Sequence, residues 1–194
     1  RNNKLRKTYR LNLKYRNWNY MKTETMFPPR DKGQQMLQAG GNLWLYFPKI
    51  NKTMRVSERN SFSNSDFSNT DLLNGNLSDD YNPTLLGIED YKGEPAYKLE
   101  CMAKSEESTY AKIMYWIRKK DLAPLRRDYY TFSNHLLKQL IMLDKSEIRG
   151  TKPDTFIMSS ILEKDKKTVL RYREYEEGKK FPDSLFTKSS LIKQ

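Results

Sequence analysis

The chain has 194 residues, a net charge of +12 and 37% hydrophobic residues, and its aromatic residues include 13 Tyr, 8 Phe and 3 Trp. No run approaches the roughly 18 to 20 consecutive apolar residues of a membrane-spanning helix, so no stretch is predicted to cross a membrane in that way. The single cysteine, Cys101, excludes an internal disulfide and a cysteine-rich zinc site, and the single histidine, His135, excludes a two-histidine metal site.

Charge is distributed unevenly along the chain. Residues 1–59 hold 14 Lys and Arg against 3 Asp and Glu, whereas residues 60–110 hold 3 against 10. A basic surface of this kind suits anionic lipid, an acidic partner protein or nucleic acid, and an ordinary solvated surface is the alternative. Charge alone therefore leaves the class of partner open.

The first predicted element is a strand with one basic face. Apolar and polar residues alternate from Lys4 to Tyr15, which is typical of a half-buried strand. A second strand is predicted over Asn19–Phe27, before the Pro28-Pro29 pair. We expect these two strands to form an antiparallel hairpin.

A second hairpin is predicted around a Gly-Gly-Asn turn. The β-prone runs Met36–Ala39 and Leu43–Phe47 flank Gly40, Gly41 and Asn42, residue types that tolerate the positive φ of a tight turn. The second run is apolar on both faces, with Leu43, Leu45 and Phe47 on one side and Trp44 and Tyr46 on the other. It is therefore predicted to be an interior strand, and Thr53–Val56 is the next strand.

The segment Ser57–Asp80 differs from the rest because it is rich in Ser, Asn and Asp. Ser68 and Asp71 have capping-box spacing, and Asn74-Gly75 is a helix stop, so one or two short helices are predicted. A disordered polar loop is the alternative. Its sparse apolar residues make it a candidate movable lid whose anchors are Phe62, Phe67, Leu72 and Leu73.

The remainder of the chain alternates with a period of two and predicts further antiparallel strands. They cover Thr84–Glu89, Pro95–Ala103, Ala111–Arg118, Leu125–Phe132, Leu136–Leu143, Phe156–Leu162 and Thr168–Tyr175, followed by a helical turn at Pro182–Thr187. This makes about ten or eleven strands in the whole chain. We expect about nine or more of them in one strongly curved sheet, because twist and unpaired edges disfavour a long flat one.

Several motifs resemble the bacterial LolA-like family of outer-membrane lipoprotein-sorting proteins. Pro28-Pro29-Arg30-Asp31-Lys32-Gly33 is followed by Gly41-Asn42-Leu43-Trp44-Leu45-Tyr46-Phe47-Pro48, and matches in the right order include Ser65-Asp66-Phe67-Ser68, Asp128-Tyr129-Tyr130 and Pro182-Asp183-Ser184-Leu185-Phe186-Thr187. The resemblance spans nearly the whole chain. It implies a single domain over residues 1–194, mainly β with short helices: an incomplete antiparallel β-barrel with a helical lid. It also implies an N-terminal helix that we expect this chain to lack.

No residue pattern indicates covalent chemistry. His135 lies in a predicted turn, and adjacent carboxylates such as Asp79-Asp80 point to opposite faces if they are on a strand. No nucleophile elbow, P-loop or dinucleotide fingerprint occurs. We therefore expect no catalytic residue, no metal site, no cofactor and no enzyme activity, and we expect Cys101 to be a buried thiol.

The alternation leaves one face of the sheet aliphatic and aromatic. The resemblance implies that this face lines a cavity for acyl chains of a lipoprotein or lipid in the periplasm, with envelope transport proteins or an anionic membrane surface as further partners. The residues assigned to it are Tyr9, Leu11, Leu13, Leu43, Leu45, Phe47, Leu99, Ile113, Tyr115 and Ile117. One alternative is a structural or adhesive envelope protein with a collapsed cavity. Another is a basic nucleic-acid-binding sheet, which is disfavoured because Tyr9 and Tyr15 alternate with the cations.

Overall fold

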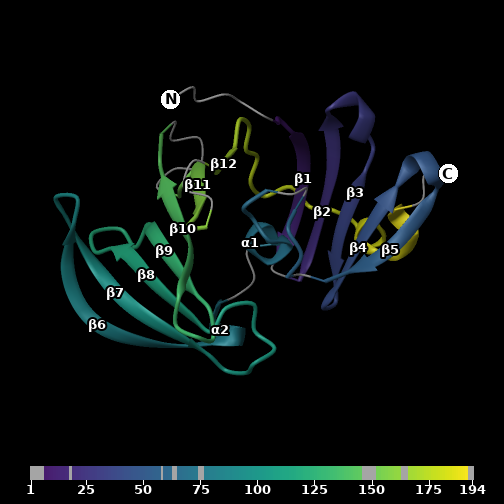
Figure 1. Ribbon diagram of the computed structural model, residues 1–194. Helices are drawn as coiled ribbons and strands as arrows, with labels where there is room; N and C mark the ends of the chain where they lie inside the picture. Colours follow the sequence, from purple (N-terminus) through teal and green to yellow (C-terminus); the bar gives the residue numbers. More distant parts are fainter. Residues whose placement is uncertain are drawn as a thin grey trace. The chain divides into compact units, whose positions relative to one another are not determined.

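The computed structural model describes residues 7–17, 19–57, 59–62, 65–73, 77–145, 152–162 and 166–191. The chain divides into two compact units, which are described separately (Figure 1). The first consists of Arg1–Asn60, Asp71–Gly75 and Gly178–Gln194, and the second of Ser61–Thr70 and Asn76–Glu177. None of the described helices is long and apolar enough to cross a membrane.

The first unit contains a five-stranded antiparallel sheet whose strands follow one another in chain order. They are β1 (Arg10–Asn17), β2 (Tyr20–Phe27), β3 (Gln35–Ala39), β4 (Asn42–Phe47) and β5 (Lys52–Val56). The predicted turn is confirmed, because Gly40 and Gly41 join β3 to β4 with φ values of 55° and 73°. The interior position of β4 is also confirmed. β1 begins at Arg10, later than predicted, and Lys4 lies outside the described residues.

One face of this first sheet packs against two short 3₁₀ helices near the C-terminus, η3 (Asp183–Phe186) and η4 (Lys188–Leu191). The shared core consists of Leu37, Tyr46, Phe186 and Leu191. Burying a side chain of this size stabilises the fold by about 1.5–3 kcal/mol, so the four together fix the helices on the sheet. Lys22 adds a hydrogen bond from its ammonium group to the Ser190 carbonyl at 2.6 Å. The helical turn predicted at Pro182–Thr187 is confirmed by η3.

The second unit contains a seven-stranded antiparallel sheet with the order β12-β11-β10-β9-β8-β7-β6. Its strands are β6 (Tyr81–Tyr91), β7 (Glu94–Ala103), β8 (Lys112–Arg118), β9 (Pro124–Tyr130), β10 (Leu136–Leu143), β11 (Thr155–Ser160) and β12 (Lys167–Arg171). Each strand pairs with its neighbour in sequence. The predicted antiparallel meander is therefore confirmed within this sheet.

The prediction of one strongly curved sheet is wrong. The described strands form two sheets, and neither closes on itself, since β1 and β5 end the first and β6 and β12 end the second. The interruption falls between β5 and β6, where the described residues contribute two short helices and the isolated Ser61–Ser68 bridge. Alternation predicts where strands occur because it follows from local backbone geometry, but it does not determine which strands pair.

The prediction of one or two short helices within Ser57–Asp80 is confirmed. They are α1 (Asn69–Leu73), directly after Ser68, and α2 (Leu77–Asp80), directly before β6. The predicted stop at Asn74-Gly75 lies outside the described residues, although α1 ends immediately before it. Phe67 is buried, so the alternative of a disordered polar loop is wrong for the part that carries this side chain.

Candidate functional site

The register of the second sheet brings four of the predicted site residues to one face. Leu99 of β7 lies opposite Tyr115 of β8, and Ile113 and Ile117 lie two residues to either side of Tyr115 along the same strand. Because side chains alternate along a strand and cross-strand partners share a face, these four point the same way. The same face, called here the apolar face of the second sheet, also carries Leu85, Cys101, Arg127, Tyr129, Leu140 and Met158.

Burial is uneven across this apolar face. Ile113, Tyr129 and Met158 are buried, whereas Leu99, Tyr115 and Ile117 are half-buried. At the β6 end, Leu85 exposes 57% of its surface. The packed half of the face therefore consists of Cys101, Ile113, Tyr129, Leu140 and Met158, and the half with Leu85, Leu99, Tyr115 and Ile117 keeps apolar surface accessible.

The packed half is covered by Tyr110 and by residues 65–68. The ring of Tyr110 lies 4.5 Å from that of Tyr129, and its hydroxyl is 3.1 Å from the Ser68 hydroxyl. Lys138, a buried residue of β10, donates its ammonium group to the Asp66 carbonyl at 3.2 Å. Polar bonds therefore hold this segment on the sheet, and Phe67 within it is buried.

Arg127 is the residue of this face that sequence reasoning missed. Its guanidinium stacks over the ring of Tyr115 at 4.4 Å, and one of its Nη atoms donates to the Tyr115 hydroxyl at 3.2 Å. Its Nε is buried and has no hydrogen-bond partner. The signal was the Arg126-Arg127 pair, because two adjacent strand residues point to opposite faces and one arginine has to face the apolar side.

The two arginines have contrasting surroundings. Arg126, on the opposite face, donates from Nε and Nη2 to the Asp128 carboxylate at 2.7 and 2.6 Å. Among the residues that the structure describes, Arg127 makes no ion pair. Burial opposes its charge, but the phenol groups of Tyr115 and Tyr129 outweigh this effect, so the pKa of Arg127 is raised above its usual value. The apolar face therefore contains a permanent positive charge.

The first sheet gathers four further predicted residues on the face opposite η3 and η4. Leu13 pairs with Thr23, Thr23 with Met36, and Met36 with Leu45, which makes one continuous cross-strand row. Leu11 lies two residues before Leu13 and Leu43 two residues before Leu45, so both point to the same face as this row. Leu43 is buried, Leu11 and Leu45 are half-buried, and Leu13 is exposed. This apolar face of the first sheet is thus a mixed surface, with Thr23 and Gln38 among its buried residues.

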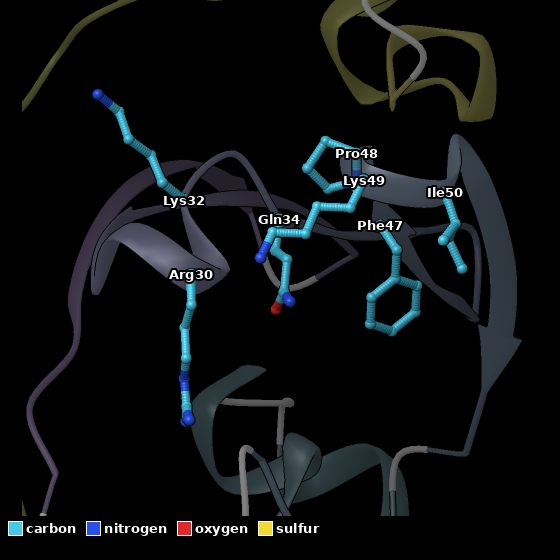
Figure 2. Close-up of a pocket in the computed structure, with 7 residues that line it drawn as sticks. All are labelled: Arg30, Lys32, Gln34, Phe47, Pro48, Lys49 and Ile50. Carbon is cyan, nitrogen blue, oxygen red and sulfur yellow. The ribbon is translucent and has the colours of Figure 1, made fainter.

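Tyr9 and Phe47 do not belong to that row. Tyr9 precedes β1 and donates its hydroxyl to Asp31 at 3.2 Å. Phe47 ends β4 and lines an open groove of about 140 Å³ with Arg30, Lys32, Gln34, Pro48, Lys49 and Ile50 (Figure 2). The groove is built from the Pro-rich and Phe-Pro motifs, which bring three basic residues around an apolar floor.

The side chains of the groove differ in direction. Figure 2 shows Phe47 and Ile50 pointing to the same side, Lys49 extending over Gln34, and Lys32 pointing away. The Arg30 Nε forms an ion pair with the Asp31 carboxylate at 3.3 Å. Ile50 exposes 66% of its surface. The groove therefore combines an exposed aliphatic side chain with neighbouring cations.

Several other predicted residues have clear positions. Phe62 is half-buried, and the side chains of Leu72 and Leu73 lie outside what the structure describes. Cys101 is a free, buried thiol, as predicted. His135 is exposed in the loop directly before β10, and no cluster of metal-binding side chains occurs within the described ranges.

The described strands form two open antiparallel sheets, and two short helices lie between β5 and β6 along the chain. A family model described as an uncharacterized protein, of the DUF1329-like kind, matches residues 19–193. The chain belongs to the family that this model describes, and its fold is that of the LolA superfamily. No curated protein sequence is similar enough to count as a match.

Solved structures support the same assignment. A LolA superfamily protein from Nitrosomonas europaea is 27% identical with a TM-score of 0.82, covering 94% of this chain and 82% of that one. A DUF1329 family protein from Desulfovibrio piger is 26% identical with a TM-score of 0.78, covering 94% and 82%. An outer membrane lipoprotein-sorting protein domain from Vibrio parahaemolyticus, 23% identical over 95% and 83%, shares the fold with a TM-score of 0.81.

Proposed function

We propose that this protein is a non-enzymatic periplasmic carrier that shelters the acyl chains of a lipid or lipoprotein against its apolar sheet faces. The observation that carries the proposal is the half-buried row Leu99, Tyr115 and Ile117 on the second sheet. These side chains retain accessible apolar surface beside a packed core, which is the arrangement that an acyl chain requires. The face of the first sheet with Leu11, Leu13, Leu43 and Leu45 offers a second such surface.

The energetics suit reversible binding. Each methylene group removed from water contributes about 0.8 kcal/mol, so a chain that buries eight of them gains roughly 6 kcal/mol. Partial burial of this kind holds a lipid in water and still permits its release to a membrane, which buries the whole chain. No proton transfer or nucleophile is needed for either step.

The family assignment supports the same proposal. The similar chain from Vibrio parahaemolyticus is described as an outer membrane lipoprotein-sorting protein domain, and the one from Nitrosomonas europaea as a LolA superfamily protein. If the present chain has the same role, its cargo is a lipoprotein or lipid and its location is the periplasm.

A structural role in the envelope is the second candidate, and one observation favours it. Ile113, Tyr129 and Met158 are buried, so part of the second sheet's apolar face is already filled by the protein's own side chains. If the rest were filled in the same way in solution, no lipid would bind.

The groove beside Phe47 supports a further part of the proposal, contact with an anionic membrane surface. The exposed Ile50 can enter the interface while Lys49 approaches a lipid phosphate and contributes about 1 kcal/mol. A carrier that delivers lipid has to meet a membrane, and this groove presents both the apolar and the cationic component of such a contact.

Mass spectrometry of a solvent extract of natively purified protein tests the carrier function. We expect a co-purified lipid or acylated peptide at close to stoichiometric amount. Titration of the delipidated protein with a fluorescent fatty acid should then show saturable binding. Failure of both experiments would leave only the structural role.

A further inference from the structure

We propose that Arg127 is a binding site for the anionic headgroup of an amphiphilic ligand, whose carboxylate or phosphate oxygens accept hydrogen bonds from the guanidinium. This inference rests on the proposed function, because the ligand's acyl chain would lie on the apolar face that surrounds Arg127. It adds a chemical requirement that acyl-chain binding alone does not contain. The cargo would carry a negative charge next to its chain.

The first observation is an incompletely satisfied cation in apolar surroundings. The register places Arg127 between Tyr115 of β8 and Leu140 of β10, with Tyr129 two residues along its own strand. Desolvating a guanidinium is unfavourable unless charge and hydrogen-bond partners compensate for it. The ring face of Tyr115 and side-chain hydrogen bonds to Tyr115 and Tyr129 compensate in part, but they leave the buried Nε without a partner.

The second observation is the contrast with the adjacent arginine. Arg126 forms a bidentate salt bridge with Asp128, the arrangement that a structural arginine commonly adopts. Arg127 lacks such a carboxylate among the described residues, although its fork matches a carboxylate or a phosphate equally well. A ligand oxyanion would supply the missing partner.

The third observation is the position of Arg127 relative to the buried part of this face. Arg127 shares a cross-strand row with the half-buried Leu99 and Tyr115 and is itself half-buried. The neighbouring row, Cys101, Ile113 and Tyr129, is buried. Neighbouring strands are about 4.8 Å apart, so the path from β9 to β6 spans roughly 14 Å, comparable with an extended twelve-carbon chain. A headgroup at Arg127 would thus place the chain beyond Tyr115, over Leu99 and Leu85.

The experiment compares three ligands that share one chain: dodecanoate, dodecyl phosphate and dodecanol. Each displaces a fluorescent fatty acid from the delipidated protein below its critical micelle concentration, at pH 8. We expect both anions to bind the parent protein at least about tenfold more tightly than the alcohol, because a charge-assisted hydrogen bond in an apolar site is worth at least that ratio.

The variants are Arg127→Met, which keeps length and removes charge, and Arg127→Lys, which keeps charge and removes the fork. Arg127→Met should bind the three ligands with similar affinity, and Arg127→Lys should retain a reduced preference for the anions. The matched control is Arg171→Met, which removes an exposed arginine from β12 and should behave like the parent. Circular dichroism and thermal unfolding establish that each variant is folded.

The outcomes separate this inference from the proposed function. Equal binding of all three ligands by the parent would overturn the role of Arg127 and leave the carrier function intact, whereas binding of none would overturn both. A preference for one anion only assigns the headgroup as carboxylate or phosphate. If Arg127→Met does not fold, NMR of the arginine Nε–H signals in the parent decides: a signal that shifts with dodecyl phosphate and not with dodecanol supports the site, and unchanged signals overturn it.

Discussion

Thr168 donates its hydroxyl to the Asp66 carboxylate across 2.7 Å, although 102 residues separate them in the chain. The Asp66 amide in turn donates to the Thr168 oxygen at 3.1 Å, and Lys166 lies 3.7 Å from the same carboxylate. The Asp66 side chain is only 3% exposed. The segment before α1 is therefore fixed to β12 by a reciprocal pair of hydrogen bonds.

The first prediction concerns this attachment. Asp66→Ala should loosen the segment 61–70, because hydrogen bonds to a buried charge are worth about 1.5–3 kcal/mol. Hydrogen exchange measured by mass spectrometry should become faster in peptides from this segment and stay unchanged in β3 and β4. The control is Glu174→Ala, an exposed carboxylate of the same unit. Unchanged exchange in Asp66→Ala would show that the attachment does not restrain the segment.

The second prediction concerns the segment as a movable lid. If residues 61–70 open and close over the apolar face of the second sheet, their amides should exchange faster than those of β4. Exchange should slow when a fatty acid is added, since a ligand that binds the closed form reduces opening. Identical protection with and without ligand would count against gating.

The third prediction separates the two faces of the first sheet. Leu45→Asn should weaken fatty-acid binding about tenfold, because an unpaired polar group next to an acyl chain costs roughly 1–3 kcal/mol. Lys14→Ala should leave affinity unchanged, since Lys14 pairs with Lys22, whose ammonium group contacts η4 on the other face. Fluorescence titration of both folded variants makes the comparison. Unchanged affinity in Leu45→Asn would remove this residue from the binding surface.

The fourth prediction concerns the groove. Lys49→Gln should reduce partition onto vesicles that contain anionic lipid by about fivefold, since one lysine near the surface contributes about 1 kcal/mol. Lys119→Gln is the control, because it removes the same charge from an exposed turn of the second unit. Vesicle sedimentation at low and high salt checks this, and binding should fall as salt rises. An equal loss of vesicle binding in both variants would show that net charge alone drives the binding and that the groove has no specific part in it.

The fifth prediction concerns Cys101. Burial raises the pKa of its thiol, although nearby Arg127 lowers it in part. A raised pKa means less of the reactive thiolate at pH 8, so a disulfide reagent should modify the native protein about tenfold more slowly than the unfolded one. Stopped-flow absorbance with and without denaturant measures this. Equal rates in the two states would show that Cys101 is accessible.

The sequence predicted several elements of the site because they depend on short-range geometry. Gly40 and Gly41 adopt the positive φ values that a two-residue turn needs, and the pairing of Leu13 with the row that ends at Leu45 follows from alternation once the strands are adjacent. Arg127 was missed because alternation assigns faces only within one strand. Whether an arginine is solvated or packed over Tyr115 depends on the neighbouring strand.

By itself, the sequence determined the strands, their antiparallel order, the hairpin at Gly40-Gly41 and the family, since each depends on local conformation or on motifs along the chain. Only the tertiary structure decided that the strands divide into two sheets, that Asp66 is held by Thr168, and that Arg127 faces the apolar side. These features arise from contacts between residues far apart in sequence. Their free energy depends on which strands become neighbours, a choice that the alternation of apolar and polar residues does not encode.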